Sequence, residues 1–294
     1  MALLLQAVVY GQWAADGGIR DGAPGDYEIS PGRLVIIWGF QGFLVLGVIV
    51  FGVLLVRDCR RARTVTLPAA LFVGFYFCVW LDPILNYRYL TYIANRQAPN
   101  VTSWGPYIPG WNPPHPELAI ESLFAASGFV YGLMVAWPLL QWLITDRIAA
   151  KRPHWGMARL LAATMVVGVV VDTVAEGLWL QTGLLSYPSS LQALSLFGGH
   201  WYQVPLQMGL MVALLFGTPI VMMRLYAIRH GTTVHIFRGS ETVSTRWSGW
   251  LRLLAGIGFT NVLILVFCIV AQFVQYFAGT DPMPADTPAY LWPR

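Results

Sequence analysis

The sequence predicts an all-α fold, a single polytopic transmembrane helical bundle of about six spans, and three observations lead to this prediction. Hydrophobic residues make up 56% of the 294 residues and charged residues only 11%, whereas soluble domains carry about 25% charged residues. Apolar runs long enough to cross a hydrocarbon core about 30 Å thick recur along the chain. Basic residues gather in every second loop between those runs. An ordinary soluble enzyme is therefore excluded.

Six apolar runs are each long enough for a transmembrane helix. We expect spans at 34–56, 67–91, 119–145, 159–185, 205–228 and 250–277. They form one transmembrane domain over residues 34–277, between an outer N-terminal segment of residues 1–33 and an outer C-terminal tail of residues 278–294. Residues 2–10 are apolar but too short to span, which favours an interfacial helix or a short buried plug. The proline-rich tail is expected to lack regular structure.

The positions of the basic residues predict the orientation of the bundle. Four arginines follow the first span, four basic residues surround the third loop, and five arginines surround the fifth, whereas the second loop holds one and the fourth none. By the positive-inside bias, the first, third and fifth loops are cytoplasmic and both termini lie outside. We therefore expect a multi-pass protein of the bacterial cytoplasmic membrane. The net charge of +4 reflects this topology and does not indicate a nucleic-acid partner.

Three carboxyl groups inside predicted spans are the strongest functional signal. Asp82 lies in the second span, and Asp172 and Glu176 lie one helical turn apart on one face of the fourth. A carboxylate at the centre of a bilayer helix costs about 2.5 to 3.5 kcal/mol on insertion scales, so such residues normally face the bundle interior and mark a functional path. Desolvation and a second carboxyl nearby both favour the protonated form, which a general acid requires. An interhelical hydrogen-bond clamp is the alternative.

Other polar groups occur at a similar depth in the outer half of the membrane. They are Asn86 one turn after Asp82, Glu117 and Glu121 at the mouth of the third span, and Gln203 and Gln207 at the outer end of the fifth. Polar groups from four spans are thus expected to meet at one level.

Two outer loops carry aromatic residues that could close this level. The loop 92–118 contains Trp104 and Trp111 among prolines and glycines that forbid regular structure. We expect an ordered lid over the carboxyl groups, with an aromatic interfacial belt as the alternative. The outer hairpin that contains His200 and Trp201 could cover the other side.

Several common catalytic motifs are absent from the sequence. It contains no H-E-x-x-H, no aspartate-rich diphosphate motif, no G-x-S-x-G and no glycine-rich nucleotide loop. Its three cysteines form no C-x-x-C pair. We therefore expect neither a metal nor a cofactor.

A family resemblance follows from five motifs. They are Asp82-Pro-Ile-Leu-Asn86, Trp104-Gly-Pro-Tyr-Ile-Pro-Gly-Trp111, Asp172-Thr-Val-Ala-Glu176, Gly183-Leu-Leu-Ser-Tyr-Pro188 and Gln203-Val-Pro205. Over about residues 75–226 the chain resembles the avermectin spirocyclase (AveC-like) family of integral membrane proteins. The matching positions are Asp82, Asn86, Trp104, Pro109, Trp111, Asp172, Glu176, Tyr187 and Gln203.

The resemblance implies a membrane cyclase of natural-product biosynthesis. The family's namesake dehydrates a macrolide precursor and forms its spiroketal, and related bacterial membrane-bound terpene cyclases close prenyl chains. The resemblance therefore implies a cyclase more firmly than it implies a terpenoid or a polyketide substrate.

The carboxyl groups inside the predicted spans and the family resemblance together predict acid-initiated cyclisation of a lipophilic substrate that enters from the bilayer. Glu176 or Asp82 would donate the proton and Asp172 would tune or accept it, while aromatic faces stabilise the resulting carbocation or oxocarbenium. The expected substrate-binding residues are Asn86, Trp104, Trp111, Trp179, Tyr187, His200, Trp201, Gln203 and Gln207. The expected partners are this small molecule and membrane lipids.

Two other functions remain open at this point. A proton-coupled transporter of a small lipophilic compound would also place carboxyl groups in spans, but it needs a polar route on both sides of the membrane. The predicted cytoplasmic halves of the spans offer almost none. A non-catalytic accessory protein would use the same groups only as clamps.

Overall fold

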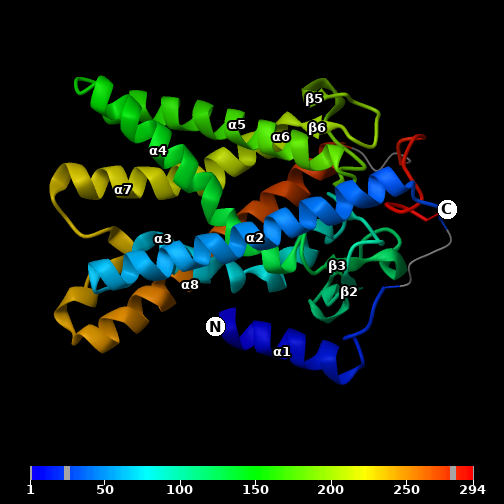
Figure 1. The fold of residues 1–294 in the computed structure, drawn as a ribbon, viewed down its shortest axis with the longest axis horizontal. Coiled ribbons are helices and arrows are strands. Elements are labelled where there is room, and N and C mark those ends of the chain that lie inside the picture. The colour runs from blue at the N-terminus through cyan, green and yellow to red at the C-terminus, as the bar shows by residue number, and fades with distance from the viewer. Residues whose placement is uncertain (1, 23–26, 279–282, 294) are drawn as a thin grey trace.

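The computed structural model describes residues 2–22, 27–278 and 283–293 as a helical bundle (Figure 1). Within these residues, five helices are long and apolar enough to cross a membrane, and one bent pair of helices is a sixth candidate. The predicted bundle of about six spans is thus confirmed, while the orientation of its termini stays a prediction. Of the two predicted flanking segments, residues 1, 23–26, 279–282 and 294 lie outside the described residues.

The helices of the bundle are of two kinds, long ones and short ones. The long ones are α2 (Pro31–Ala62), η4 with α4 (Gly128–Val135 and Ala136–Lys151), α5 (Met157–Gln181), the run of α6, η6 and α7 (Leu206–Val212, Ala213–Gly217 and Thr218–His230), and α8 (Thr245–Ala278). The short ones are α1 (Ala2–Ala15), α3 (Leu67–Tyr76), η1 (Val79–Asn86), η2 (Gly105–Tyr107), η3 (Pro116–Leu118), η5 (Gln192–Leu194), η7 (His235–Phe237) and η8 (Ser240–Thr242).

The second predicted span is not one straight helix, which corrects the expectation for 67–91. The α-helix α3 ends at Tyr76, and the 3₁₀ helix η1 continues at an angle of 58° to it. Pro83 inside η1 has no N–H to donate and its ring obstructs the preceding turn, which disfavours a continuous α-helix. Asn261 of α8 caps the break, because its Nδ2 donates to the Phe77 carbonyl at 3.1 Å. The bend brings Asp82 into the protein interior, where it is 1% exposed.

The third span begins at Gly128 and not at residue 119. The intervening residues form β3 (Ile120–Ser122), which pairs antiparallel with β2 (Asn100–Thr102) so that Val101 lies opposite Glu121. The side chain of Glu121, which we expected at the mouth of a span, is therefore carried on a strand and buried, with 3% exposure.

Three two-stranded ladders gather at one end of the bundle, called the loop end below. Besides β2 and β3, β1 (Ile93–Ala94) pairs with β4 (Leu185–Ser186), and β5 (Ser195–Leu196) pairs with β6 (Val204–Pro205), all antiparallel. The β1 and β4 ladder joins two loops that lie almost 100 residues apart in the sequence, and it fixes their relative register. Figure 1 shows β2, β3, β5 and β6 at one end of the bundle, on either side of the N-terminal part of α2.

The loop between η1 and η4 is ordered and packs on η1, as the predicted lid requires. Trp104 Nε1 donates to the Trp80 carbonyl at 3.0 Å, and Trp111 Nε1 donates to the Pro83 carbonyl at 2.9 Å. Helix α1 supports this loop from outside, because the rings of Tyr10 and Trp13 lie 5.1 Å and 5.7 Å from that of Trp104. The apolar N-terminal segment is thus a helix that covers the lid.

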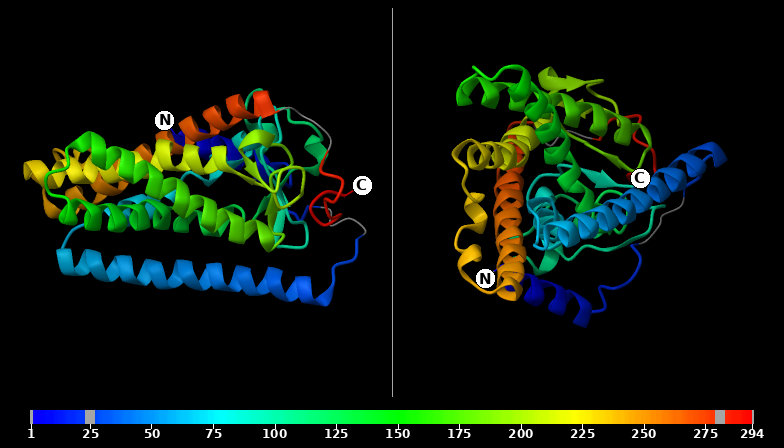
Figure 2. Two further views of the ribbon diagram at one scale, coloured as in Figure 1. Left: turned by 90° about the horizontal axis from the view of Figure 1, so that it is seen from above. Right: turned by 60° about the vertical axis from the view of Figure 1, so that its left-hand side comes forward.

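Two further elements complete the bundle. Helix α2 lies along its edge as a separate layer (Figure 2, left), and it exposes many apolar side chains, as lipid contact requires. The described part of the C-terminal tail contains neither helix nor strand, as expected, but Tyr290 and Leu291 are buried beside Ile93 of β1. The apolar side chains of the tail therefore attach it to the loop end.

Two glycines set the close approach of α3 and α8. A Cβ on Gly256 would overlap the carbonyl of Ala70, and one on Gly74 would lie 2.7 Å from the Gly256 oxygen. By contrast, a Cβ on Gly258 of the same helix α8 would meet open space. Small residues let membrane helices pack backbone to backbone.

We therefore predict that Gly256→Ala destabilises the folded protein by roughly 1–3 kcal/mol, because the two helices must separate. Gly258→Ala is the matched control, and it should leave stability unchanged or slightly raised, since alanine favours a helix. Thermal unfolding of the two variants in detergent measures the difference. Equal melting temperatures would show that this contact is not tight.

Candidate active site

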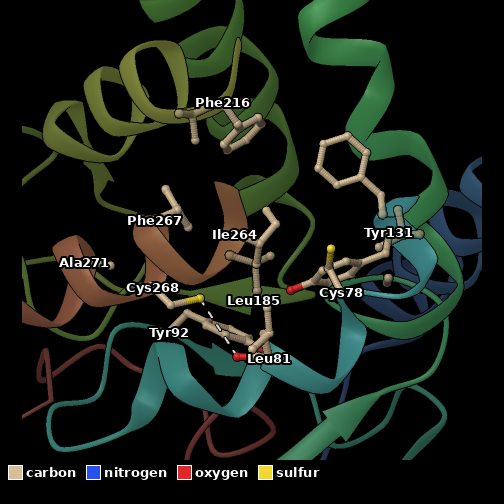
Figure 3. Packing of buried hydrophobic residues seen from close by; sticks show 14 of the residues in the cluster. Cys78, Leu81, Tyr92, Tyr131, Leu185, Phe216, Ile264, Phe267, Cys268 and Ala271 are labelled. Carbon is tan, nitrogen blue, oxygen red and sulfur yellow. Dashed lines mark hydrogen bonds between the residues drawn. The ribbon is translucent and has the colours of Figure 1, made fainter. Parts of the chain in front are cut away.

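A cavity lies at the loop-end half of the bundle, with a volume of about 80 Å³. Most of its wall is apolar or aromatic, and Figure 3 shows wall residues Tyr92, Tyr131, Leu185, Phe216 and Phe267 coming from different parts of the chain. The wall residues are Asp82, Leu85, Thr91, Tyr92, Ala126, Tyr131, Met134, Trp137, Asp172, Glu176, Trp179, Leu185, Tyr187, Met208, Val212, Phe216 and Phe267. All three carboxyl groups predicted to be catalytic thus face one space.

Two phenols fix the carboxyl group of Asp82. The hydroxyl of Tyr92 donates to Oδ2 and that of Tyr131 donates to Oδ1, and all three side chains are buried. Hydrogen bonds to both oxygens favour the charged form of a carboxyl group. The sequence identified Asp82 but gave no signal for either tyrosine, because the partners come from a loop and from another helix.

Glu121 is a fourth acid of this site; the sequence placed it at the same level as the other three but not among the catalytic residues. Its carboxyl group lies near enough to that of Asp82 for their charges to interact, and its Oε1 accepts a hydrogen bond from the Ser103 hydroxyl, while its Oε2 has no hydrogen-bond partner among the described residues. Burial, and then the charge of Asp82, raise the pKa of Glu121 well above its ordinary value. Two neighbouring buried carboxyl groups cannot both ionise cheaply. Because the phenols stabilise the charge on Asp82, the shared proton belongs mainly to Glu121.

The opposite wall carries the pair Asp172 and Glu176 on α5. The Tyr187 hydroxyl donates to Glu176 Oε1 at 2.6 Å. Among the described residues, Asp172 Oδ2 and Glu176 Oε2 have no hydrogen-bond partner, and neither has the indole nitrogen of Trp179. Buried polar atoms are nearly always paired, so this wall has acceptors and a donor available for a bound molecule.

Two predicted substrate-binding residues line the cavity, Trp179 and Tyr187. Two others position wall tyrosines instead. The Asn86 amide accepts from the Thr91 and Tyr92 N–H groups and donates to the Tyr92 carbonyl at 2.9 Å. Gln203 Nε2 donates to the Tyr187 carbonyl at 2.7 Å. Their polar groups are therefore occupied by the backbone.

The remaining five predicted residues also lie outside the cavity wall. The indole N–H groups of Trp104 and Trp111 donate hydrogen bonds to backbone carbonyls of η1, as described above. His200 is exposed and contacts Asp286 at 2.9 Å, and Trp201 lies beneath the Arg33 guanidinium. Gln207 is buried, with its amide facing the Leu191 N–H and the Leu194 carbonyl. These contacts shape the loop end around the cavity.

Fold and cavity together define a polytopic helical protein with a buried acidic site. The family model described as Spirocyclase AveC-like matches residues 60–290, and the chain belongs to this family. No curated protein and no solved structure matches it. The matched region contains every residue of the cavity wall and Glu121, but neither α1 nor most of α2. The resemblance inferred from the motifs is confirmed, and the family suggests a cyclase role.

The proton on Glu121 predicts a dependence of stability on pH. In the folded protein Glu121 keeps a proton that the unfolded chain releases above the ordinary pKa of 4.5. Stability should therefore fall as the pH rises above that value, by at most about 1.4 kcal/mol per pH unit for one proton. We expect the melting temperature of Glu121→Gln to fall less steeply between pH 5 and about 8 than that of the wild type.

Glu117→Gln is the control for this measurement, because the Glu117 side chain is exposed on the same loop. Its melting curve should keep the wild-type slope. Parallel curves for wild type and Glu121→Gln would contradict a shared proton at Glu121.

Proposed function

We propose that this protein is an intramembrane cyclase that starts ring closure of a lipophilic substrate by protonating it. The observation that carries the proposal is the meeting of three carboxyl groups, from two separate elements, at one largely apolar cavity. Membership of the AveC-like family suggests the cyclase role. The substrate is a terpenoid or polyketide intermediate of natural-product biosynthesis, drawn from the bilayer.

The two walls differ in their chemistry, and this difference assigns the acid and the base. Asp172 and Glu176 lie one turn apart in a dry interior, so the pair retains a proton, and each has an unpartnered oxygen. This pair, through Glu176, is the proton donor to an alkene, epoxide, ketone or hydroxyl group. Asp82, stabilised as a carboxylate by two phenols, accepts the proton that the ring-closed cation loses.

Aromatic side chains supply the other requirement of such chemistry. A carbocation or oxocarbenium survives only where water is excluded and negative charge lies close. Trp137, Trp179 and Phe216 line the cavity, and a ring face contributes about 0.5 to 2 kcal/mol to a nearby cation. The Asp82 carboxylate adds a full negative charge to the same space.

The size of the cavity constrains how the substrate binds. Its volume of about 80 Å³ is smaller than the roughly 150 Å³ cavity that admits benzene in another protein. The closed form therefore holds only the reacting end of a long molecule, and the walls must move apart to admit it. We propose that access lies beside α2, because Phe40 on this edge helix contacts the wall residue Trp179, with ring centroids 6.1 Å apart.

Turnover by purified protein tests the proposal. Linear prenylated and linear polyketide probes are incubated with protein in detergent and excess chelator, and mass spectrometry looks for a cyclised product of equal mass or lighter by one water. We expect Asp82→Asn and Glu176→Gln to lower kcat by roughly 10²-fold or more, because each keeps the shape but loses the proton site. Glu117→Gln, an exposed carboxyl outside the cavity, should retain full turnover.

Folded Asp82→Asn and Glu176→Gln proteins with wild-type turnover would refute the acid and base assignment. Accumulation of an unchanged probe inside proteoliposomes, with no product, would favour the transporter instead.

A further inference from the structure

Two wall tyrosines face each other across the β1 and β4 ladder. The ladder pairs Ile93 with Ser186 and Ala94 with Leu185, and one step further the same register places Tyr92 opposite Tyr187. Residues opposed in an antiparallel pair point to the same face, with Cβ atoms about 4.5–5.5 Å apart. Tyr92, Leu185 and Tyr187 all line the cavity, as this register requires.

Each tyrosine of this pair is bound to a different acid. The Tyr92 hydroxyl donates to Asp82 and the Tyr187 hydroxyl donates to Glu176. Asn86 and Gln203 fix the backbone of the two residues through their carbonyls. The strand register therefore places a phenol bound to one acid opposite a phenol bound to the other.

The proposed reaction needs such a connection. Cyclisation begins when the Asp172 and Glu176 pair gives up a proton, and it ends when Asp82 receives one from the product. No proton is consumed overall, but after each turnover the proton lies on the opposite wall. A second turnover requires the proton to return from Asp82 to the Asp172 and Glu176 pair. Besides these acids, Tyr92 and Tyr187, the described residues that line the cavity include one more titratable group, Tyr131, which is bound to Asp82.

We propose that Tyr92 and Tyr187 form a proton relay that carries the proton from Asp82 back to Glu176, an inference that rests on the proposed cyclase function. The Asp82 carboxyl gives its proton to the Tyr92 oxygen while Tyr92 gives its own to the Tyr187 oxygen. Tyr187 in turn gives its proton to the Glu176 carboxylate. Asp82 is left ionised, Glu176 is left protonated, and both phenols are neutral again.

The surroundings of the two phenols suit this role. Burial, and then the charge of Asp82, raise the pKa of Tyr92 well above its ordinary value. Burial and the charges of Glu176, Asp172 and Asp82 raise the pKa of Tyr187 in the same way. Both residues therefore stay neutral phenols, which can accept one proton while donating another.

Infrared spectroscopy of the full chain in detergent tests the relay without any substrate. After mixing with D₂O, the carbonyl stretching bands of protonated carboxyl groups shift as each group exchanges its proton. The spectra of Glu176→Gln and Glu121→Gln assign the bands of the two walls. Because the relay joins the walls, we expect both bands of the wild type to exchange at one common rate.

The variants separate a relay from a structural role. Tyr92→Phe and Tyr187→Phe each keep the ring but remove one hydroxyl, and either should split the common rate into two that differ by about tenfold or more. Tyr76→Phe is the control, since it removes a half-buried hydroxyl that donates to the Phe129 carbonyl at 2.9 Å and does not line the cavity, and it should keep one rate. Gel filtration and thermal unfolding check that each variant is folded.

A single rate in both Tyr92→Phe and Tyr187→Phe, or two rates in the wild type, would overturn the relay. The exchange measurement does not depend on turnover. If the two carboxyl bands exchange at one common rate but the protein yields no cyclised product, the cyclase proposal is refuted and the connection between the acids is not.

Discussion

The burial of four carboxyl groups in an apolar bundle is the constraint on which the loop-end half of the structure depends. A buried acid needs hydrogen-bond donors or a proton, and a regular helix offers neither, because its own backbone groups are already paired. The chain meets the need by leaving helical structure at this end. The break before η1 turns Asp82 inward, the β2 and β3 pair presents Glu121 to it, and the β1 and β4 pair presents Tyr92 and Tyr187.

The opposite half of the bundle shows the contrast. Gln141 donates to the Thr164 carbonyl and to the Thr218 hydroxyl, and the Thr164 hydroxyl donates to that of Thr145. Arg224 pairs with Asp146 at 2.6 Å. These polar groups bind one another across helices and act as clamps. The unpartnered carboxyl oxygens of the cavity wall lie only in the other half, which favours chemistry at one level over a route through the membrane.

Hydropathy, charge bias and helical spacing were sufficient to predict the bundle, the three acids and the shared face of Asp172 and Glu176. Each of these depends on residues close together in the sequence. The break after Tyr76 was missed because Phe77 and Cys78 are as apolar as the residues before them, although Pro83 was a usable signal. Tyr92, Tyr131 and Glu121 were missed as site residues because strand register and contacts between distant segments place them. Trp104, Trp111, Asn86 and Gln203 were expected to bind substrate, whereas the structure shows their polar groups bound to the backbone that frames the site.

The position of a bound molecule tests the central claim most directly, namely that the acidic cavity is where the substrate reacts. The measurement is an electron cryo-microscopy map of the Glu176→Gln protein with a cyclisable probe. We expect density for the reacting end of the probe between Asp82 and residue 176, with the walls moved apart to admit it. Density only in the apolar recess of about 480 Å³ beside Trp142 and Arg224 at the other end, with the acidic cavity still closed, would contradict the claim.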